Sequence, residues 1–317
     1  MGGGSLRLRP VTEALAVKDL VLRYGRTAAV RAASFTAESG LVTAVVGPNG
    51  AGKTSIIETC EGYRKPTSGT VRAFGLDPRA DARALRPRIG VMLQEGGVPS
   101  GARSLDALRH MASLYKNPLD PVSLAERLGL RTVRATYRRM SGGEQQRLKF
   151  AIALIGRPEF VFLDEPTAGL DAAAKRVVWD VISELRANGV TVVLTTHLMD
   201  DVERLADQVV VIDAGAVVAT GSPDELRGSE DDSLTFNGPL GLDLTVLNAG
   251  LPAGTLASES SAGRYEVTGD CGPHTLAAVT RWCAVSGFMP RDLCTGRRRL
   301  EDVVIQLTSG GVAHEHS

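Results

Sequence analysis

A glycine-rich stretch near residue 50 has the residue types and the spacing that bind phosphate. It matches the pattern GxxxxGK[ST] and is followed by one more serine: Gly47, Pro48, Asn49, Gly50, Ala51, Gly52, Lys53, Thr54 and Ser55. Glycines let successive backbone N–H groups point at one anion, and a helix that starts there adds the positive end of its dipole. The Lys53 ammonium can bridge the β- and γ-phosphates of a nucleotide, and the Thr54 hydroxyl can bind Mg²⁺. The stretch therefore predicts a nucleoside triphosphate site.

Two adjacent carboxylates later in the chain could supply the rest of a phosphoryl-transfer site. The apolar run Phe160–Leu163 ends in Asp164 and Glu165. At the end of a buried strand, Asp164 can hold Mg²⁺ through water, and Glu165 is placed to polarise an attacking water. An apolar run followed by Asp-Glu is common, so this pattern gains its weight from the phosphate-binding stretch.

Alternating strands and helices are expected to position these groups. Apolar runs predict strands at residues 14–21, 29–36, 41–46, 89–93, 160–163 and 190–195. The run at 41–46 is continuous, as expected of a strand buried on both faces. Periodicity and capping signals predict helices at residues 53–62, 172–188 and 199–206, and a mostly helical segment at 104–155. A β-hairpin is expected at 208–219, and a short helix from Pro223.

A third motif resembles the signature of ATP-binding cassette (ABC) ATPases. Residues 140–147 read MSGGEQQR, where that family has Leu-Ser-Gly-Gly-Gln at the start of a helix. Met140 replaces the usual leucine, and Glu144 takes the place of the usual glutamine. We interpret this as a permitted variant, because Ser141 and the N–H groups of Gly142 and Gly143, which could grip a γ-phosphate, are intact.

Four single residues fall where the same family carries further functional groups. The resemblance implies that Tyr24 stacks on adenine and that Gln94 senses Mg²⁺ and the γ-phosphate. It also implies that Asp171 belongs to the loop that follows the paired carboxylates, and that His197 is the switch histidine of hydrolysis. All these landmarks occur in the family's order between residues 14 and 228.

The resemblance implies an α/β fold: a P-loop NTPase core of ABC type, with a mixed sheet and a helical signature subdomain. A polar, acidic change in composition near 228–233 marks a boundary. We therefore expect a flexible leader at residues 1–13, the ATPase domain at 14–228, a small C-terminal α+β domain at 229–310 and a tail at 311–317. In the third of these, short strands are predicted, the clearest at 264–268, with helices near 275–285 and 300–307.

The resemblance also implies a mechanism that needs a second copy of the chain. In this family the phosphate-binding loop and the signature of one chain are too far apart to share a nucleotide. Two copies pair head to tail, so that ATP and Mg²⁺ lie between Lys53 of one copy and Ser141 of the other. ATP then favours the closed dimer, and hydrolysis removes the γ-phosphate that bridged it. Because every catalytic landmark is present, we expect a homodimer with two competent sites.

Composition and charge disfavour some classes of partner and require others. In 317 residues, 36 Lys and Arg balance 36 Asp and Glu, so no basic field favours nucleic acid as a partner. No run reaches the ~18 apolar residues of a membrane-spanning helix, so transport would require a separate permease subunit. The expected location is the cytoplasmic face of the cell membrane. Four cysteines without CxxC spacing fit a reducing compartment, and the preference for arginine over lysine suggests a bacterium.

The last helix helps to choose among the transport systems of this family. Residues 297–308, RRRLEDVVIQLT, resemble the ending of the ATPases of bacterial ABC-2 type exporters, including the daunorubicin-resistance group, although a plain amphipathic helix would look similar. The leading hypothesis is an ATPase that drives export of a small molecule such as a drug, an antibiotic or a lipid-like compound. The alternatives are an ABC importer subunit, or a soluble ABC protein acting on ribosomes or DNA, which the single cassette and the zero net charge disfavour.

Overall fold

The computed structural model describes residues 13–94, 96–227, 232–297 and 300–309, and its contacts divide the chain into two units. The first unit comprises residues 1–223 and 306–317, and the second comprises residues 224–305. The sequence placed the boundary at 228/229, within residues that are not described. The predicted tail and all of the predicted leader except Glu13 also lie outside the described residues, so these limits stay predictions.

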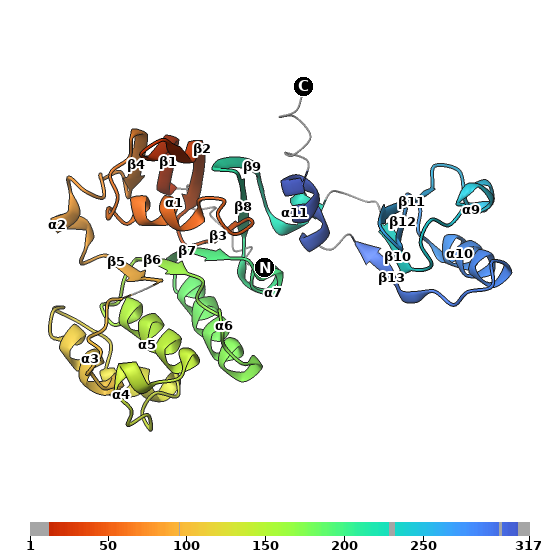
Figure 1. The fold of residues 1–317 in the computed structure, drawn as a ribbon. Coiled ribbons are helices and arrows are strands. Elements are labelled where there is room, and N and C mark those ends of the chain that lie inside the picture. The colour runs from red at the N-terminus through yellow and green to blue at the C-terminus, as the bar shows by residue number, and fades with distance from the viewer. Residues whose placement is uncertain (1–12, 95, 228–231, 298–299, 310–317) are drawn as a thin grey trace, which may run out of the picture. The chain divides into compact units, whose positions relative to one another are not determined.

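The main sheet of the first unit has six strands (Figure 1). Its strands, in spatial order, are β5 (Ile89–Met92), β6 (Phe160–Asp164), β7 (Thr191–Thr196), β3 (Val42–Val46), β8 (Gln208–Asp213) and β9 (Ala216–Gly221). All neighbours pair in parallel except β8 and β9, which form the predicted hairpin. Every residue of β3, β6 and β7 is buried, which confirms the burial predicted for the run at 41–46 and shows it for the other two strands. Because these three strands are adjacent and parallel, the residues that follow them meet at one edge.

A second, antiparallel sheet packs with the first helix to complete the core of this unit. Its order is β2 (Thr27–Glu38), β1 (Glu13–Tyr24) and β4 (Ser68–Ala73). Helix α1 (Lys53–Cys60) buries Ile56 and Ile57 in one apolar cluster with Leu20 of β1 and Phe160 and Phe162 of β6. The loop that precedes α1 is therefore held between two packed layers.

The segment 104–155 is mostly helical, as predicted, and is divided into several helices. It forms α3 (Ser104–Ala112), α4 (Pro121–Arg127), a short 3-10 turn (Tyr137–Arg139) and α5 (Gly142–Leu154). Pro121 starts α4 behind its cap Asp120, and Gly129 takes a positive φ of 64° just after α4 ends. These local signals begin and end α4 and so divide the segment into separate helices. The other helices of this unit are α2 (Ala82–Leu85), α6 (Ala172–Ala187) and α7 (Met199–Leu205).

The second unit has its own sheet and its own core. Its elements follow a β-α-β-β-α-β order: β10 (Asp232–Asn237), α9 (Thr245–Gly250), β11 (Leu256–Ser261), β12 (Arg264–Thr268), α10 (Pro273–Val285) and β13 (Arg291–Arg297). The antiparallel sheet has the order β11-β12-β10-β13, which is the split β-α-β arrangement of ferredoxin-like folds. Phe236, Tyr265 and Trp282 lie in its core.

Two short helices lie near the limits of the second unit. Helix α8 (Pro223–Arg227) starts at the predicted proline, and α11 (Leu300–Ser309) covers the predicted C-terminal helix. In the described residues no helix has the length and apolarity that crossing a membrane would need.

Candidate functional site

The phosphate-binding stretch forms a tight loop between β3 and α1, as predicted. Gly47, Gly50 and Gly52 have φ values of 152°, 84° and 102°, in the region that favours glycine. A Cβ atom on Gly47 would lie 2.0 Å from the carbonyl oxygen of Ile212. The loop can take this shape only with glycine at that position.

Lys53 lies folded over this loop. Its Nζ donates hydrogen bonds to the carbonyl oxygens of Gly47, at 2.7 Å, and Pro48, at 3.0 Å, and the residue is only 7% exposed. Burial lowers the pKa of Lys53, and the charges of Glu165 and Asp164 oppose that shift. The ammonium is thus confined where the phosphates of a nucleotide would enter the loop.

The paired carboxylates follow β6 and are held by its neighbour β7. The Thr195 hydroxyl donates to Asp164 Oδ1 and accepts from the Glu165 backbone N–H at 3.0 Å. Glu165 has a φ of 50°, a strained conformation for a residue other than glycine. Its carbonyl oxygen accepts a 2.5 Å hydrogen bond from Gln146 Nε2 of α5. Motif matching gave no role to Thr195 or Gln146, because only the pairing of β6 with β7 and the packing of α5 bring them here.

His197 contacts the side chain of Glu165. Its Nδ1 lies 2.9 Å from Oε1 and 2.8 Å from Oε2 of that carboxylate. A carboxylate accepts only, so Nδ1 carries the hydrogen in this contact. The hydrogen bond runs to Oε1, and Oε2 lies beside the same nitrogen, buried and with no other hydrogen-bond partner among the described residues. The carboxylate therefore keeps acceptor capacity beyond its contact with His197.

A cavity of about 170 Å³ brings together the three residues predicted to bind the metal, Thr54, Gln94 and Asp164. Hydroxyl, amide and carboxylate oxygens are the donors that Mg²⁺ prefers, so this set fits the ion. The backbone carbonyl of Gln94 accepts a 2.8 Å hydrogen bond from Lys149 Nζ of α5. That bond ties the end of β5 to the helix that begins with the signature motif.

Two further acids, Glu58 and Glu61 of the α1 region, line the same cavity. Burial, together with the charges of Asp164 and Glu58, raises the pKa of Glu61 from 4.5 to about 9. The folded protein therefore keeps a proton on Glu61 over a pH range in which the unfolded chain has lost it. Raising the pH through that range, from about 4.5 to about 9, destabilises the fold.

Glu61→Gln should remove this pH dependence. At pH 8 we expect the variant to unfold at least about 3 °C above the wild type, the shift that about 1 kcal/mol produces in a unit of this size. At pH 4.5 the two proteins should unfold at similar temperatures. Thermal unfolding followed by circular dichroism from pH 4.5 to 9 tests this, with Glu13→Gln on the exposed start of β1 as the matched control. Parallel curves for wild type and Glu61→Gln would contradict the prediction.

Tyr24, at the end of β1, lies beside the phosphate-binding helix. Its hydroxyl is 3.2 Å from Ser55 Oγ, and the side chain remains 44% exposed. The guanidinium carbon of Arg64 lies 5.1 Å from the centre of its ring, so one face of the ring is covered. The other face can stack on a base.

The signature motif starts α5 through a capping box. The Ser141 backbone N–H donates to Glu144 Oε2 at 2.7 Å, and Ser141 Oγ lies 3.0 Å from the same oxygen. The Glu144 N–H in turn donates to Ser141 Oγ at 3.3 Å. The Glu144 carboxylate therefore occupies Ser141, one of the groups that the resemblance assigns to a γ-phosphate, and it must turn away before Ser141 can bind one.

Asp171 caps the start of α6, as Ser141 caps the start of α5. Its Oδ1 accepts the N–H of Ala174 at 2.8 Å and caps the helix. The loop before it begins at Thr167, two residues beyond Glu165. The structure thus places Asp171 at a helix start, and shows for it a capping bond rather than a contact with the other predicted residues.

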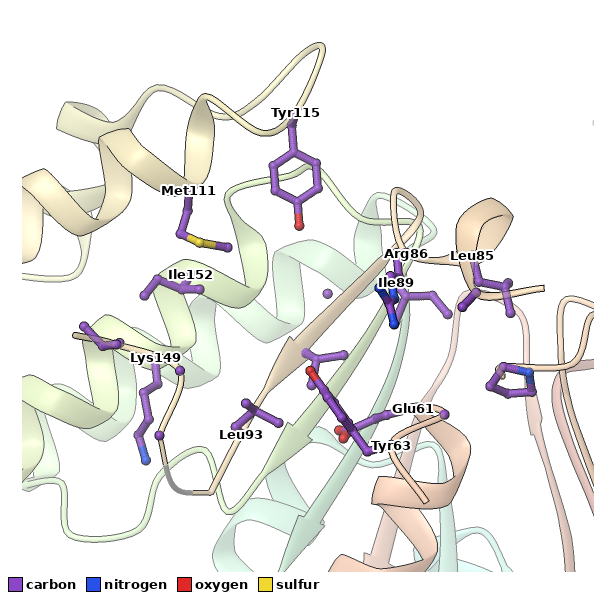
Figure 2. A pocket seen from close by; sticks show the side chains of 18 of the residues that line it. Glu61, Tyr63, Leu85, Arg86, Ile89, Leu93, Met111, Tyr115, Lys149 and Ile152 are labelled. Carbon is purple, nitrogen blue, oxygen red and sulfur yellow. The ribbon is translucent and has the colours of Figure 1, made fainter. Parts of the chain in front are cut away.

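A larger cavity of about 520 Å³ lies beside the site (Figure 2). One wall comes from the end of α1 and from β5, with Glu61, Tyr63 and Ile89, and the other comes from α3 and α5, with Met111 and Ile152. Glu61 and Leu93 line this cavity and the smaller one as well. A molecule bound here would contact both the nucleotide-binding core and the signature helix.

The fold and the site together define a nucleoside triphosphatase of the P-loop class. The family described as "ABC transporter" matches residues 30–168. The chain is 33% identical over 311 residues to the daunorubicin resistance ATP-binding protein DrrA3 of Streptomyces coeruleorubidus, a match that covers 93% of this chain and 96% of that protein. It is 32% identical to the Nod factor export ATP-binding protein I of Ralstonia nicotianae, covering 94% of each chain.

Solved structures agree with these relatives. The ATP-binding subunit of an ABC transporter superposes with a TM-score of 0.62 at 26% identity, over 68% of this chain and 92% of that one. A dimeric ATP-binding cassette bound to ADP and Pi shares the fold, with a TM-score of 0.59 at 20% identity over 66% of this chain and 98% of that one. The chain belongs to the family of ABC transporter ATP-binding subunits, ATPases related to those of drug-resistance and Nod factor export systems. This confirms the family and the fold that the motifs predicted.

Proposed function

We propose that this chain is the ATPase subunit of a bacterial exporter, working at the cytoplasmic face of the membrane with a separately encoded permease. The observation that carries the proposal is the extent of its likeness to DrrA3, a protein named for daunorubicin resistance. That likeness covers 96% of DrrA3 and so is not confined to the ATPase motifs. A second relative is named for export of a different compound. A small molecule such as a drug, an antibiotic or a lipid-like compound is therefore the class of cargo that we propose.

Two copies of the chain would bind two ATP molecules head to tail. Lys53 and the loop N–H groups would hold the phosphates, Tyr24 the base, and Ser141, Gly142 and Gly143 of the other copy the γ-phosphate. Thr54, Gln94 and Asp164 would hold Mg²⁺, which neutralises charge on the phosphate oxygens.

Glu165 would then polarise the attacking water. Its carboxylate, which His197 orients through Nδ1, would receive the water proton. Hydrolysis removes the group that joined the two copies, so the dimer opens and resets the permease.

The permease would dock in the larger cavity through a short helix. The cavity supports this proposal because its floor and sides combine apolar groups, such as Leu85 and Ile152, with the Arg86 and Glu61 side chains. It also adjoins the cavity that Gln94 lines. A helix seated there would contact the groups next to the metal site.

Co-expression with the proposed permease tests the docking site. Ile152→Glu places a charge in the apolar part of the cavity and should reduce copurification at least about tenfold, since burying an unpaired charge is costly. Leu114→Glu, at an exposed position in the turn after α3, is the control and should copurify normally. Equal recovery of both variants would contradict docking in this cavity.

Inverted membrane vesicles test the direction of transport. With wild-type chain and permease, ATP should drive daunorubicin, the first probe, into the vesicles. Dependence on an external binding protein, with movement of solute out of the vesicles, would instead support the importer alternative.

A further inference from the structure

Asp201 of α7 is a buried carboxylate with no part in the site described so far. It is 0% exposed, and no salt bridge involves it among the described residues. Its Oδ1 accepts a 2.7 Å hydrogen bond from Trp179 Nε1 of α6. Its Oδ2 accepts from the hydroxyls of Thr167 and, at 3.0 Å, Thr196. A buried charge is costly unless it is well satisfied, and here three neutral donors converge on it.

The two threonines connect Asp201 to the reacting end of the site. Thr167 lies two residues after Glu165, and Thr196 directly precedes His197. One carboxylate oxygen therefore joins the two chain segments that carry the Glu165–His197 pair.

The hydrogen bonds of Thr195 restrain the chain on one side of the Glu165–His197 pair only. Thr195 fixes the segment before it, by bonding the Asp164 side chain and the Glu165 N–H. Nothing in that set of bonds restrains the chain after Glu165, which leaves in a strained left-handed turn with a φ of 50°. Two of the side-chain bonds described restrain that exit: Gln146 Nε2 bonds the Glu165 carbonyl oxygen, and the Thr167 hydroxyl bonds Asp201 farther along the chain. The Thr196 hydroxyl, which also accepts the Leu198 N–H at 2.9 Å, restrains the turn at His197 in the same way.

We propose that Asp201 is a positioning residue for ATP hydrolysis: by bonding Thr167 and Thr196 together, it keeps Glu165 and His197 in register. This inference rests on the proposed roles of Glu165 and His197. It assigns to α7 a function in catalysis that depends on packing behind the site and not on contact with the nucleotide.

Asp201→Asn tests the proposal with little change in volume. Trp179 Nε1 can only donate, so the amide oxygen must face it, and the amide NH₂ then meets the two hydroxyls as a donor. We expect kcat to fall about 10- to 100-fold, as displacements of about 1 Å do at active sites. The Kd for ATP should stay within about twofold, because Lys53 and its loop are untouched. In a Glu165→Gln background, Asp201→Asn should lower kcat no further, since both changes act on one group.

Two further comparisons separate positioning from stability. Thr167→Val should lower kcat like Asp201→Asn, whereas Thr167→Ser, which keeps the hydroxyl, should restore it. Trp179→Phe removes a bond to the same carboxylate but leaves both threonines in place, so it should lower the unfolding temperature and leave kcat within about threefold.

Three results would overturn the proposal. They are a wild-type kcat for Asp201→Asn, a wild-type kcat for Thr167→Val, and a loss of kcat in Trp179→Phe equal to that in Asp201→Asn. If Asp201→Asn does not fold, the contrast between valine and serine at position 167 decides the matter. Failure of Glu165→Gln itself to lower kcat would instead contradict the proposed role of Glu165.

Discussion

Glu165→Gln is expected to lower kcat for ATP hydrolysis about 10²- to 10⁴-fold, the range over which a positioned general base contributes. The amide has the shape of the carboxylate and can still accept a hydrogen bond from His197 Nδ1. It cannot take a proton from water, and its neighbours provide no substitute: Asp164 is bonded by Thr195. Phosphate-release assays under saturating ATP measure the loss.

The same variant should keep its affinity for ATP and form a stable dimer. Lys53 and the loop that bind phosphate are unchanged, so the γ-phosphate enters and stays. Size-exclusion chromatography with ATP should then show a dimer that the wild type forms only transiently. Glu159→Gln, the same substitution just before the other end of β6, is the control and should behave as wild type. Normal turnover by Glu165→Gln would contradict its assignment as the catalytic carboxylate.

Motifs whose geometry is set by neighbouring residues were predictable from the sequence. The turn from β3 into α1 depends on Gly47, Gly52 and the run that follows, so its shape is encoded within one short segment. The strand before Asp164 was predicted in the same way, from an uninterrupted apolar run. In both cases the local pattern allows one structure, and that structure is compatible with the tertiary fold.

The parts of the site that depend on long-range packing were not predictable from one sequence. Thr195, Gln146 and Asp201 are ordinary polar residues in their own segments, and only the order β6-β7-β3 and the packing of α5 and α7 give them partners. Glu144 stands in the signature motif among the residues expected to bind the nucleotide, and in the structure it forms a capping box with Ser141 at the helix start. A capping pattern and a phosphate-binding pattern use the same donors, so sequence alone could not separate them.

In the second unit, short strands and two helices were expected, but only β12 among the four strands was located from the sequence, and helix α9 was missed. β12 alternates Tyr265 and Val267 inward with polar residues between them, a clear period of two. β11 buries only Ala257 and is otherwise exposed, as expected at a sheet edge, so it has no such pattern. Edge strands of this kind take their structure from the neighbour with which they pair.

Lys53→Ala is expected to weaken ATP binding about 10- to 150-fold. A hydrogen bond to a charged group contributes about 1.5–3 kcal/mol, and the ammonium is the buried cation nearest the phosphate-binding loop in the described structure. Without it, the Gly47 and Pro48 carbonyls also lose their donor, so the empty loop should become less ordered. Titration with a fluorescent ATP analogue measures Kd, and Lys65→Ala, an exposed lysine soon after α1, is the control.

Removing Mg²⁺ distinguishes the role of Lys53 from that of the metal-binding set. Lys53 would act on the phosphates by its own charge, so the ratio of variant to wild-type Kd should remain when EDTA replaces Mg²⁺. For Thr54→Ala the same ratio should approach one in EDTA, because the hydroxyl contributes through the ion. Retention of wild-type affinity by Lys53→Ala would contradict phosphate binding at this loop. If the Kd ratio for Lys53→Ala instead fell to one in EDTA, Lys53 would act by ordering the loop around the metal and not by binding the phosphates.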